Sequence, residues 1–240
     1  MKLRVPRGFS LAVQYLLDEW LPPILRDSAW FMYLPMRLLF GQYTSEMMNF
    51  KDRAFELTET EFSGVYVRTA SVNELQGQTD LNPACIREIL ASLVGQDILE
   101  VGCGRGHLLG LIERGAGSTG TRNITGCDIV IPSALKAALP NVTLTQANIE
   151  SLPFATDAFD TVICTHTLEH VQHLSLAISE LRRVTRRRLI IVVPRQRPYR
   201  YTFSLHINFF PYVWSLTGQF GHHPGAVVKR LGDWYYQEDF

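Results

Sequence analysis

The residues best suited to chemistry begin with a glycine-rich run, which reads E-V-G-C-G-R-G over 100–106. Glycine lets a backbone turn sharply and approach a ligand closely, and the start of a following helix offers N–H groups to a carboxylate or phosphate. The G-x-G-x-G spacing differs from the G-x-G-x-x-G of dinucleotide-binding loops. Glu100 would repel a pyrophosphate but attract an amino group, so the run predicts a loop for a small ligand that carries one.

Two further polar residues follow apolar stretches of the chain. Asp128 ends one of them, and Asn148 comes after the next. Ligands of open α/β sheets bind at the carboxyl ends of the strands, so we expect Asp128 to accept hydrogen bonds from ribose hydroxyls. Asn148 and the apolar Ile149 are expected to meet a ring such as adenine. The alternative for Asp128 is a helix N-cap, for a helix that begins near Pro132.

The third group of reactive side chains is His166, Glu169 and His170, with His206 further along the chain. If 166–170 is helical, positions i, i+3 and i+4 share one face. Imidazoles and carboxylates are the usual proton acceptors and cation ligands of enzymes.

These residues need strands and helices to position them, and such a pattern starts after residue 80. The expected strands are 97–101, 123–127, 142–146, 159–164 and 189–193. The expected helices are 85–93, 106–114, 132–139 and 174–185, and a closing hairpin is expected from 227–231 and 234–237. The alternation indicates an α/β domain with a doubly wound, mostly parallel sheet covered on both faces by helices.

Residues 1–80 have little strand character and are expected to form a helical cap on a domain of residues 81–240. The pattern predicts helices over 11–20, 30–40 and 45–57, broken by Pro22-Pro23, Pro35 and Gly41. The most apolar stretch, 29–41, is shorter than the ~20 residues that span a bilayer. It is either packing surface or a peripheral contact with a membrane.

Charge and cysteine usage exclude some classes of function. The 240 residues include 23 basic and 23 acidic side chains, which argues against a nucleic-acid partner. None of the four cysteines, Cys85, Cys103, Cys127 and Cys164, has the close spacing of a metal-ligand pair. We expect reduced core thiols in a cytoplasmic protein.

Four segments taken in order resemble one family. LEVGCGRG, the acid in CDIV, NIESLPF and FDTVICTHTLEHV resemble the class I S-adenosylmethionine-dependent methyltransferases, in particular the small-molecule group with an L-E-H-V segment. The resemblance covers 80–240 and is specific for fold and cofactor, not for substrate. It implies a seven-stranded Rossmann-like sheet with one antiparallel strand.

The resemblance also implies which residues hold the cofactor, S-adenosyl-L-methionine. They are Glu100, Gly102, Cys103, Gly104, Gly106, Asp128, Ile129, Asn148, Ile149 and Thr165. The family usually has aspartate where this chain has Asn148, but an amide oxygen can also accept from the adenine amino group.

Methyl transfer to a hydroxyl would also require removal of a proton, and His166, Glu169, His170 and His206 are the candidate catalytic residues. Some O-methyltransferases of quinone biosynthesis and the small-RNA 2′-O-methyltransferases hold a divalent cation with a related E-x-x-E-H segment, whose first acid is His166 here. Three interpretations stay open: a cation site, a single histidine base, and a structural turn without metal. We favour the turn and assign no metal.

The substrate is expected beside the loops that follow the last parallel strands. Candidate substrate contacts are Tyr199, Tyr201, Asn208 and Phe209, with His206. Residues 181–200 hold eight arginines and no acid, which indicates either solvated side chains or an anionic substrate.

The expected reaction is methylation of a hydroxyl of a small metabolite, sugar or lipid-linked intermediate. The alternatives are N- or C-methylation and an inactive methyltransferase-fold partner subunit. An NAD-dependent oxidoreductase is disfavoured by the spacing of the glycine loop.

Overall fold

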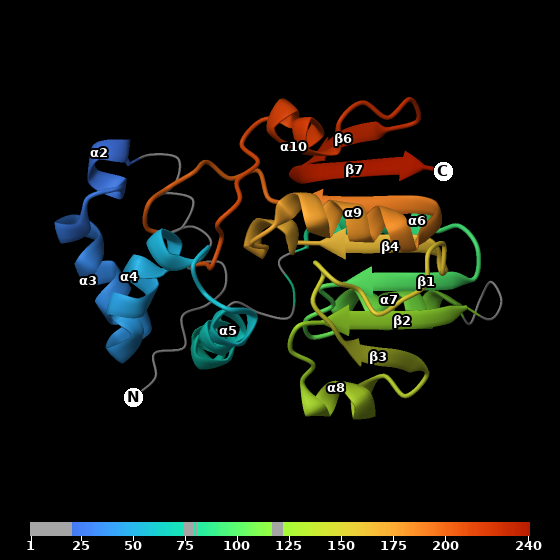
Figure 1. Cartoon of the computed structure of the whole chain (residues 1–240), viewed down its shortest axis with the longest axis horizontal. Coiled ribbons are helices and arrows are strands. Elements are labelled where there is room, and N and C mark those ends of the chain that lie inside the picture. The colour runs from blue at the N-terminus through green and yellow to red at the C-terminus, as the bar shows by residue number, and fades with distance from the viewer. Residues whose placement is uncertain (1–20, 74–78, 80, 117–121) are drawn as a thin grey trace. The chain divides into compact units, whose positions relative to one another are not determined.

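The computed structural model describes residues 21–73, 79, 81–116 and 122–240, so the helix predicted for 11–20 lies outside the described residues. The chain divides into two compact units (Figure 1). One comprises Met1–Asp80 with Arg197–Ile207, and the other comprises Leu81–Gln196 with Asn208–Phe240. Residues 197–207, which the sequence analysis placed in the second part, therefore group with the first.

The first unit is helical. Its helices are α2 (Pro23–Arg26), α3 (Ala29–Phe40), α4 (Thr44–Arg53) and α5 (Glu59–Asn73), with a 3-10 turn η1 (Gly41–Tyr43) before α4. Met32, Met36 and Phe40 recur every four residues and bury one side of α3 in a core that also contains Tyr201 and Leu205. Among the described ranges, no helix combines the length and the apolarity that crossing a bilayer demands.

Two predictions for this unit were wrong. Pro35 was expected to break a helix, but it lies inside α3, where the buried side chains on either side of it outweigh the loss of one backbone hydrogen bond. The helix predicted for 45–57 ends at Arg53, and α5 was not predicted because its apolar residues show little periodicity.

The second unit is a seven-stranded sheet, as predicted. Its strands are β1 (Asp97–Val101), β2 (Asn123–Asp128), β3 (Val142–Gln146), β4 (Phe159–Thr165), β5 (Thr185–Val193), β6 (Val227–Leu231) and β7 (Asp233–Asp239). Their order is β3-β2-β1-β4-β5-β7-β6. The first five strands are mutually parallel, while β7 is antiparallel to both of its neighbours. The predicted mostly parallel sheet with one antiparallel strand is confirmed.

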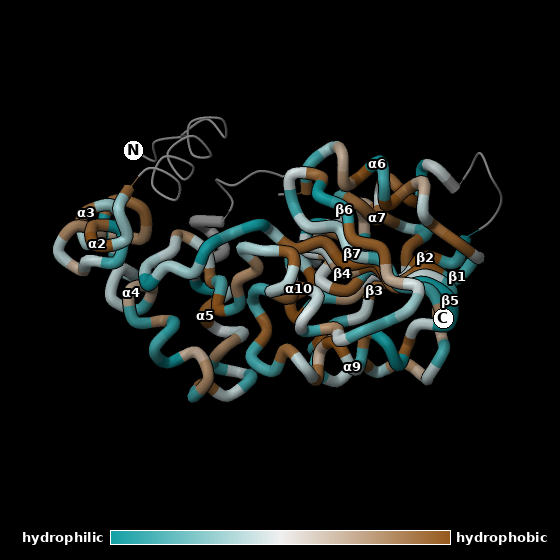
Figure 2. The backbone as a smooth tube through the Cα atoms, turned by 90° about the horizontal axis from the view of Figure 1, so that it is seen from above, coloured by the Kyte–Doolittle hydropathy of each residue, from teal (hydrophilic) through white to brown (hydrophobic). Residues whose placement is uncertain are grey.

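Helices cover both faces of this sheet. α6 (Pro83–Ser92), α7 (His107–Ala116) and α8 (Ser133–Ala138) share one core with the strands, and α9 (Leu174–Val184) and α10 (Val213–Phe220) share the other. Figure 2 shows the apolar strands between these two helical layers. Successive strand residues alternate between the cores: Ile190 belongs to the first and Leu189 and Ile191 to the second.

Two elements of this unit differ from the prediction. β5 starts at Thr185 instead of residue 189. Its first half was not predicted because it is basic, and only the apolar second half has the composition typical of a strand. The helix α10 was not predicted, because it carries few charges and no clear polar face.

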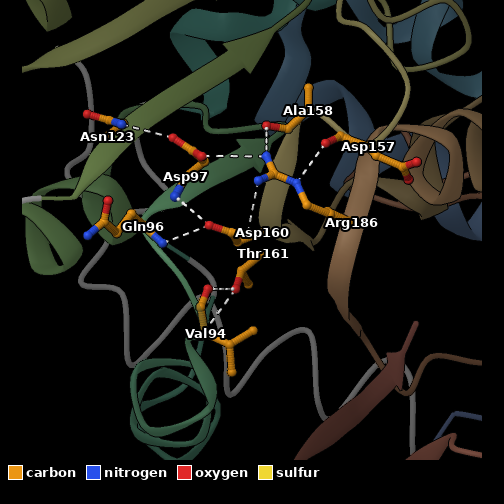
Figure 3. Close-up of polar contacts among 9 residues, drawn as sticks. All are labelled: Val94, Gln96, Asp97, Asn123, Asp157, Ala158, Asp160, Thr161 and Arg186. Atoms are coloured by element: carbon orange, nitrogen blue, oxygen red, sulfur yellow. Dashed lines mark hydrogen bonds and ion pairs between the residues drawn. The ribbon is translucent and has the colours of Figure 1, made fainter.

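The amino ends of β1, β4 and β5 are joined by a polar network (Figure 3). Asp160 accepts from the backbone N–H groups of Gln96 (2.8 Å) and Asp97 (3.2 Å), and Arg186 lies within 3.5 Å of both acids. Burial alone would raise the pKa of Asp160, but these N–H donors and Arg186 outweigh burial and lower it. The network fixes the register of the strands at the edge opposite to the one where ligands bind in this type of sheet.

Candidate functional site

The glycine run forms a tight loop between β1 and α7. The N–H groups of Gly102 and Cys103 donate to the carbonyl of Cys127 at 2.8 and 3.1 Å, which folds the loop over the end of β2. Gly102 has a φ of 76°, and a Cβ there would lie 1.9 Å from Oγ1 of Thr167. Gly104 also has a positive φ, 50°, but a Cβ on it would meet nothing within 4 Å. The loop is therefore packed on one side, at Gly102, and open at Gly104, where a ligand can approach the backbone.

Two acids flank this loop from adjacent strands. Glu100 is only 3% exposed, and burial together with the neighbouring Asp128 raises its pKa to about 8. Burial likewise raises the pKa of Asp128, although its two oxygens accept from the N–H groups of Gly104 (2.8 Å) and Val130 (3.1 Å). Two carboxyls that disfavour each other's charge would both be stabilised by a cationic ligand.

This arrangement fits the cofactor that the family resemblance implies. Glu100 Oε2 is buried without a hydrogen-bond partner in the described part of the chain, and a buried acceptor of this kind needs a donor. The amino group of S-adenosylmethionine would be such a donor. Each oxygen of Asp128 accepts a hydrogen bond from a backbone N–H and keeps a lone pair that can accept a ribose hydroxyl. Asp128 does not cap α8, whose N-cap is Pro132.

The remaining predicted cofactor residues lie on the neighbouring strand ends. Oδ1 of Asn148 accepts from the N–H of Glu150 at 3.0 Å, which stabilises the turn after β3. Ile149 is buried in the core on the α9 side of the sheet, and Ile129 is partly exposed beyond β2. Thr165 ends β4 and is buried. Their contacts with a cofactor stay predictions.

The cysteines are confirmed as buried, free thiols. Burial raises the pKa of each of them, including Cys103 inside the glycine loop. A buried thiol with a raised pKa is unreactive, so the sulfur of Cys103 contributes packing.

The H-T-L-E-H segment is not a helix, contrary to the condition set for it in the sequence analysis. Only Leu168–His170 form a 3-10 turn, η3, and His166 has a left-handed backbone with a φ of 49°. His166 and Glu169 still meet, because the turn reverses the chain: Nδ1 of His166 lies 3.5 Å from Oε1 of Glu169.

A third residue, Asp233, completes this cluster and was missed in the sequence analysis. Its Oδ2 lies 3.4 Å from Nε2 of His166 and accepts from Nδ2 of Asn82 at 2.8 Å. Burial opposes the charged imidazole, but the carboxylates of Asp233 and Glu169 outweigh it and raise the pKa of His166 to about 10. His166 is therefore a cation at neutral pH. Nothing in the sequence marks Asp233 except its place after the glycine of a hairpin.

His170 and Asn208 belong to the same region. His170 ends η3 and is partly exposed. Nδ2 of Asn208 donates to the carbonyls of Leu168 (3.0 Å) and Val171 (2.8 Å). Asn208 thus holds η3 in place and has used its two amide donors, so only its oxygen remains for the predicted substrate contact.

The other predicted catalytic and substrate residues are divided between the units. Phe209 is in the second unit and partly exposed, whereas Tyr199, Tyr201 and His206 are in the first. There, Arg26 donates to the carbonyl of Tyr201 and lies over the ring of Tyr199. The two tyrosines are buried in the helical unit, and their roles toward a substrate stay predictions.

Most of the arginine-rich segment is used for internal ion pairs. Five of its arginines pair with acids: Arg182 with Glu238, Arg183 with Glu180, Arg186 with Asp97 and Asp160, Arg188 with Asp239, and Arg200 with Asp52. The other three, Arg187, Arg195 and Arg197, are exposed. Arg187 acts on Asp160 at the amino ends of the strands, so Arg195 and Arg197 carry what remains of the argument for an anionic substrate.

Comparison with known proteins agrees with this geometry. Residues 99–193 match a family model described as a methyltransferase domain. The chain is 35% identical over 109 residues to a ubiquinone biosynthesis O-methyltransferase of Paracidovorax citrulli, covering 41% of this chain and 44% of that protein. It is 26% identical over 153 residues to a demethylmenaquinone methyltransferase of Staphylococcus aureus, covering 61% of each. The chain thus spans less than two thirds of the length of these relatives.

A solved structure shares the fold more completely. The magnesium protoporphyrin IX methyltransferase of Synechocystis, solved with bound S-adenosylmethionine, superposes with a TM-score of 0.53 and 18% identity. The match covers 76% of this chain and 97% of that one. At this identity the match shows the fold alone.

Proposed function

We propose that the protein transfers a methyl group to a hydroxyl of a small, lipid-linked acceptor, because this chain carries a methyltransferase domain of the S-adenosylmethionine-dependent class I family. The observation that supports methyl transfer is the pair of acids, the buried Glu100 and the partly exposed Asp128, beside a glycine loop that is open at Gly104. The relatives named for ubiquinone and demethylmenaquinone support an acceptor of the quinone class, in which a polar ring carries an apolar tail.

When bound, S-adenosylmethionine supplies a methyl group on a positively charged sulfur, so the protein's task is to align the acceptor and exclude water. In this proposal Glu100 accepts from the cofactor's amino group and Asp128 accepts from its ribose. The carbonyl of Cys127, which two N–H groups of the loop already share, keeps the backbone of the loop turned toward the ligand.

In this proposal, a group other than His166 removes the acceptor's proton. A charged imidazole cannot accept a proton, and His166 is charged at neutral pH. His166 is therefore a positioning residue in this proposal: its ion pairs with Glu169 and Asp233 anchor the loop whose Thr167 packs against Gly102. His170 and His206 stay the candidate bases.

Calorimetry with S-adenosylhomocysteine tests the cofactor half of the proposal. Asp128→Ala should weaken binding at least tenfold, because a lost hydrogen bond to a charged group costs ~1.5–3 kcal/mol. Glu113→Gln is the matched control, since Glu113 lies on the next helix and pairs with Asn141. Equal affinity of all three proteins would refute the assignment of Asp128.

Mass spectrometry of acceptors tests the other half. The purified protein with S-adenosylmethionine should add one methyl group to a prenylated catechol, and a matched analogue without the free hydroxyl should stay unmodified. Methylation of the hydroxyl-free analogue would instead support N- or C-methylation. Cofactor binding without turnover of any acceptor would support the inactive partner subunit.

A further inference from the structure

Helix α3 is apolar on two sides, but the described residues of its unit bury only one of them. Met32, Met36 and Phe40 are buried in the core of the helical unit. Large apolar side chains also project from the other side and from the neighbouring α2. They are Ile24, Trp30, Tyr33, Leu34 and Leu38, which are 81%, 75%, 54%, 63% and 81% exposed. We call these five residues the α3 face.

A surface of this kind is unusual. Scattered apolar side chains are normal on a protein, but a contiguous group marks an interaction site. Trp30, Leu34 and Leu38 follow one another at intervals of four residues, so they lie along one line of the helix. A helix that is apolar all round is expected to be enclosed by protein or lipid.

The composition of the α3 face favours lipid. Tryptophan and tyrosine are enriched where a membrane meets water, because one end of each ring is apolar and the other is polar. Arg37 is the only charged residue in 29–45; it is exposed, and its guanidinium donates to the carbonyl of Gly41. A long cationic side chain beside an apolar face is suited to anionic headgroups.

Size argues against a second copy of the chain as the partner. α3 has 12 residues and is about 18 Å long, and the α3 face has five side chains. A stable protein interface needs roughly 20–30 residues from each side. An interfacial helix has no such minimum, since lipid can surround whichever side chains enter it.

We propose that the α3 face is a membrane-binding surface, on which α3 lies in the interface with Trp30, Leu34 and Leu38 inserted among the lipids. The helix lies along the membrane and does not cross it. This inference goes beyond the methyl-transfer proposal and holds for any acceptor, although a lipid-linked acceptor would be encountered at such a surface.

Flotation of the full-length protein with phosphatidylcholine vesicles, with and without phosphatidylglycerol, tests this proposal. The protein should float with both kinds, and phosphatidylglycerol should strengthen binding about fivefold through Arg37, the effect of one basic residue near an anionic surface. The double variant Leu34→Glu/Leu38→Glu should bind at least ~10-fold more weakly, because each charge would have to enter the interface. Leu176→Glu, which changes an exposed leucine of α9, should bind like the wild type.

Trp30 provides a second measurement. Its fluorescence should shift to shorter wavelength on addition of vesicles, and Trp30→Phe should abolish that shift. Calorimetry with S-adenosylhomocysteine checks that the second unit of each variant is intact. Only Leu176→Glu lies in that unit, so the other variants should bind S-adenosylhomocysteine like the wild type.

Three results would overturn the proposal. The first is wild-type protein that does not float with either kind of vesicle. The second is flotation that Leu34→Glu/Leu38→Glu does not weaken. The third is a dimer in vesicle-free solution that the same double variant dissociates, which would make the α3 face a contact between copies of the chain.

Discussion

The ion pair between His166 and Asp233 leads to a quantitative prediction. Asp233→Asn removes one of the two carboxylates that face His166 and keeps the size of the side chain, while Glu169 remains 3.5 Å from the imidazole. An opposite charge within ~4–6 Å shifts a pKa by ~1–3, which corresponds to ~1.4–4 kcal/mol, and the 3.4 Å separation of an ion pair without a hydrogen bond favours the lower part of that range. Since ~1.36 kcal/mol corresponds to a change of 1 in pKa, the pKa of His166 should fall from about 10 to between about 8 and 9.

The same substitution should lower the stability of the fold by a related amount. The pKa of His166 in the folded protein, about 10, is higher than the ~6.5 of an unfolded chain. The charged imidazole therefore stabilises the fold fully below about pH 6.5, and this stability is lost as the pH rises through about 10. In Asp233→Asn the loss should be complete about 1 to 2 pH units earlier, and the free energy of unfolding at about pH 7 should be lower by ~1.5–2.5 kcal/mol.

Two measurements on the same samples check this prediction. Proton NMR of Cε1-labelled histidine follows the imidazole, and urea denaturation gives the free energy of unfolding. The resonance of His166 is identified by its absence in His166→Asn, a residue that tolerates the left-handed backbone at this position. Asp239→Asn is the control, since Asp239 is on the same strand but pairs with Arg188 at 2.6 Å.

The reasoning would be refuted by a wild-type His166 that titrates near its ordinary pKa. It would also be refuted by an Asp233→Asn protein that is destabilised while the pKa of His166 stays unchanged. In either case Asp233 would act only through its hydrogen bond from Asn82.

Three more predictions concern the site. Glu100→Gln should stabilise the free protein at pH 7 by ~1–3 kcal/mol in urea denaturation. The folded pKa of about 8 lies above the ~4.3 of an unfolded chain, so the wild-type protein loses stability as the pH rises from about 4.3 to 8. The variant should also bind S-adenosylhomocysteine more weakly, and a variant that is less stable as well as weaker in binding would contradict this role. Gly104→Ala should cost only ~1 kcal/mol of stability yet reduce cofactor affinity at least tenfold in calorimetry. Gly102→Ala should destabilise the fold more strongly, because its Cβ would overlap Thr167. If Gly104→Ala were the more destabilising of the two, the open side of the loop would be wrongly assigned. Methyltransferase activity should be unaffected by a chelator or by added Mg²⁺, as the interpretation of the L-E-H-V segment as a turn without metal predicts, and chelator-sensitive activity would revive the cation site.

Local sequence patterns predicted most of the second unit. β1, β3 and β6 have the predicted bounds, because each is a short apolar or β-branched run between residues that end strands. The positions of Glu100 and Asp128 at adjacent strand ends followed from the same patterns. A parallel sheet with helical crossovers brings consecutive strand ends to one edge, so order along the chain was enough to predict that these acids meet.

The helical unit was less predictable. The intrinsic signals at Pro35 and Gly41 indicate breaks, yet burial of Met32 and Met36 carries α3 through the proline. The grouping of 197–207 with the first eighty residues depends on contacts such as that of Lys51 with the carbonyl of Tyr199, which join positions far apart in sequence. Local propensity contains no information about such contacts.

The sequence by itself determined the succession of strands and helices along the second unit, the glycine loop and the two acids beside it, because these follow from periodicity and from the positions of a few residue types. Only the tertiary structure decided that His166 is a cation and not a proton acceptor. That property depends on Asp233, which is 67 positions away and reaches His166 because β7 enters the sheet antiparallel beside β5. The charge of a buried imidazole is set by the carboxylates around it, and these become neighbours only when the sheet is assembled.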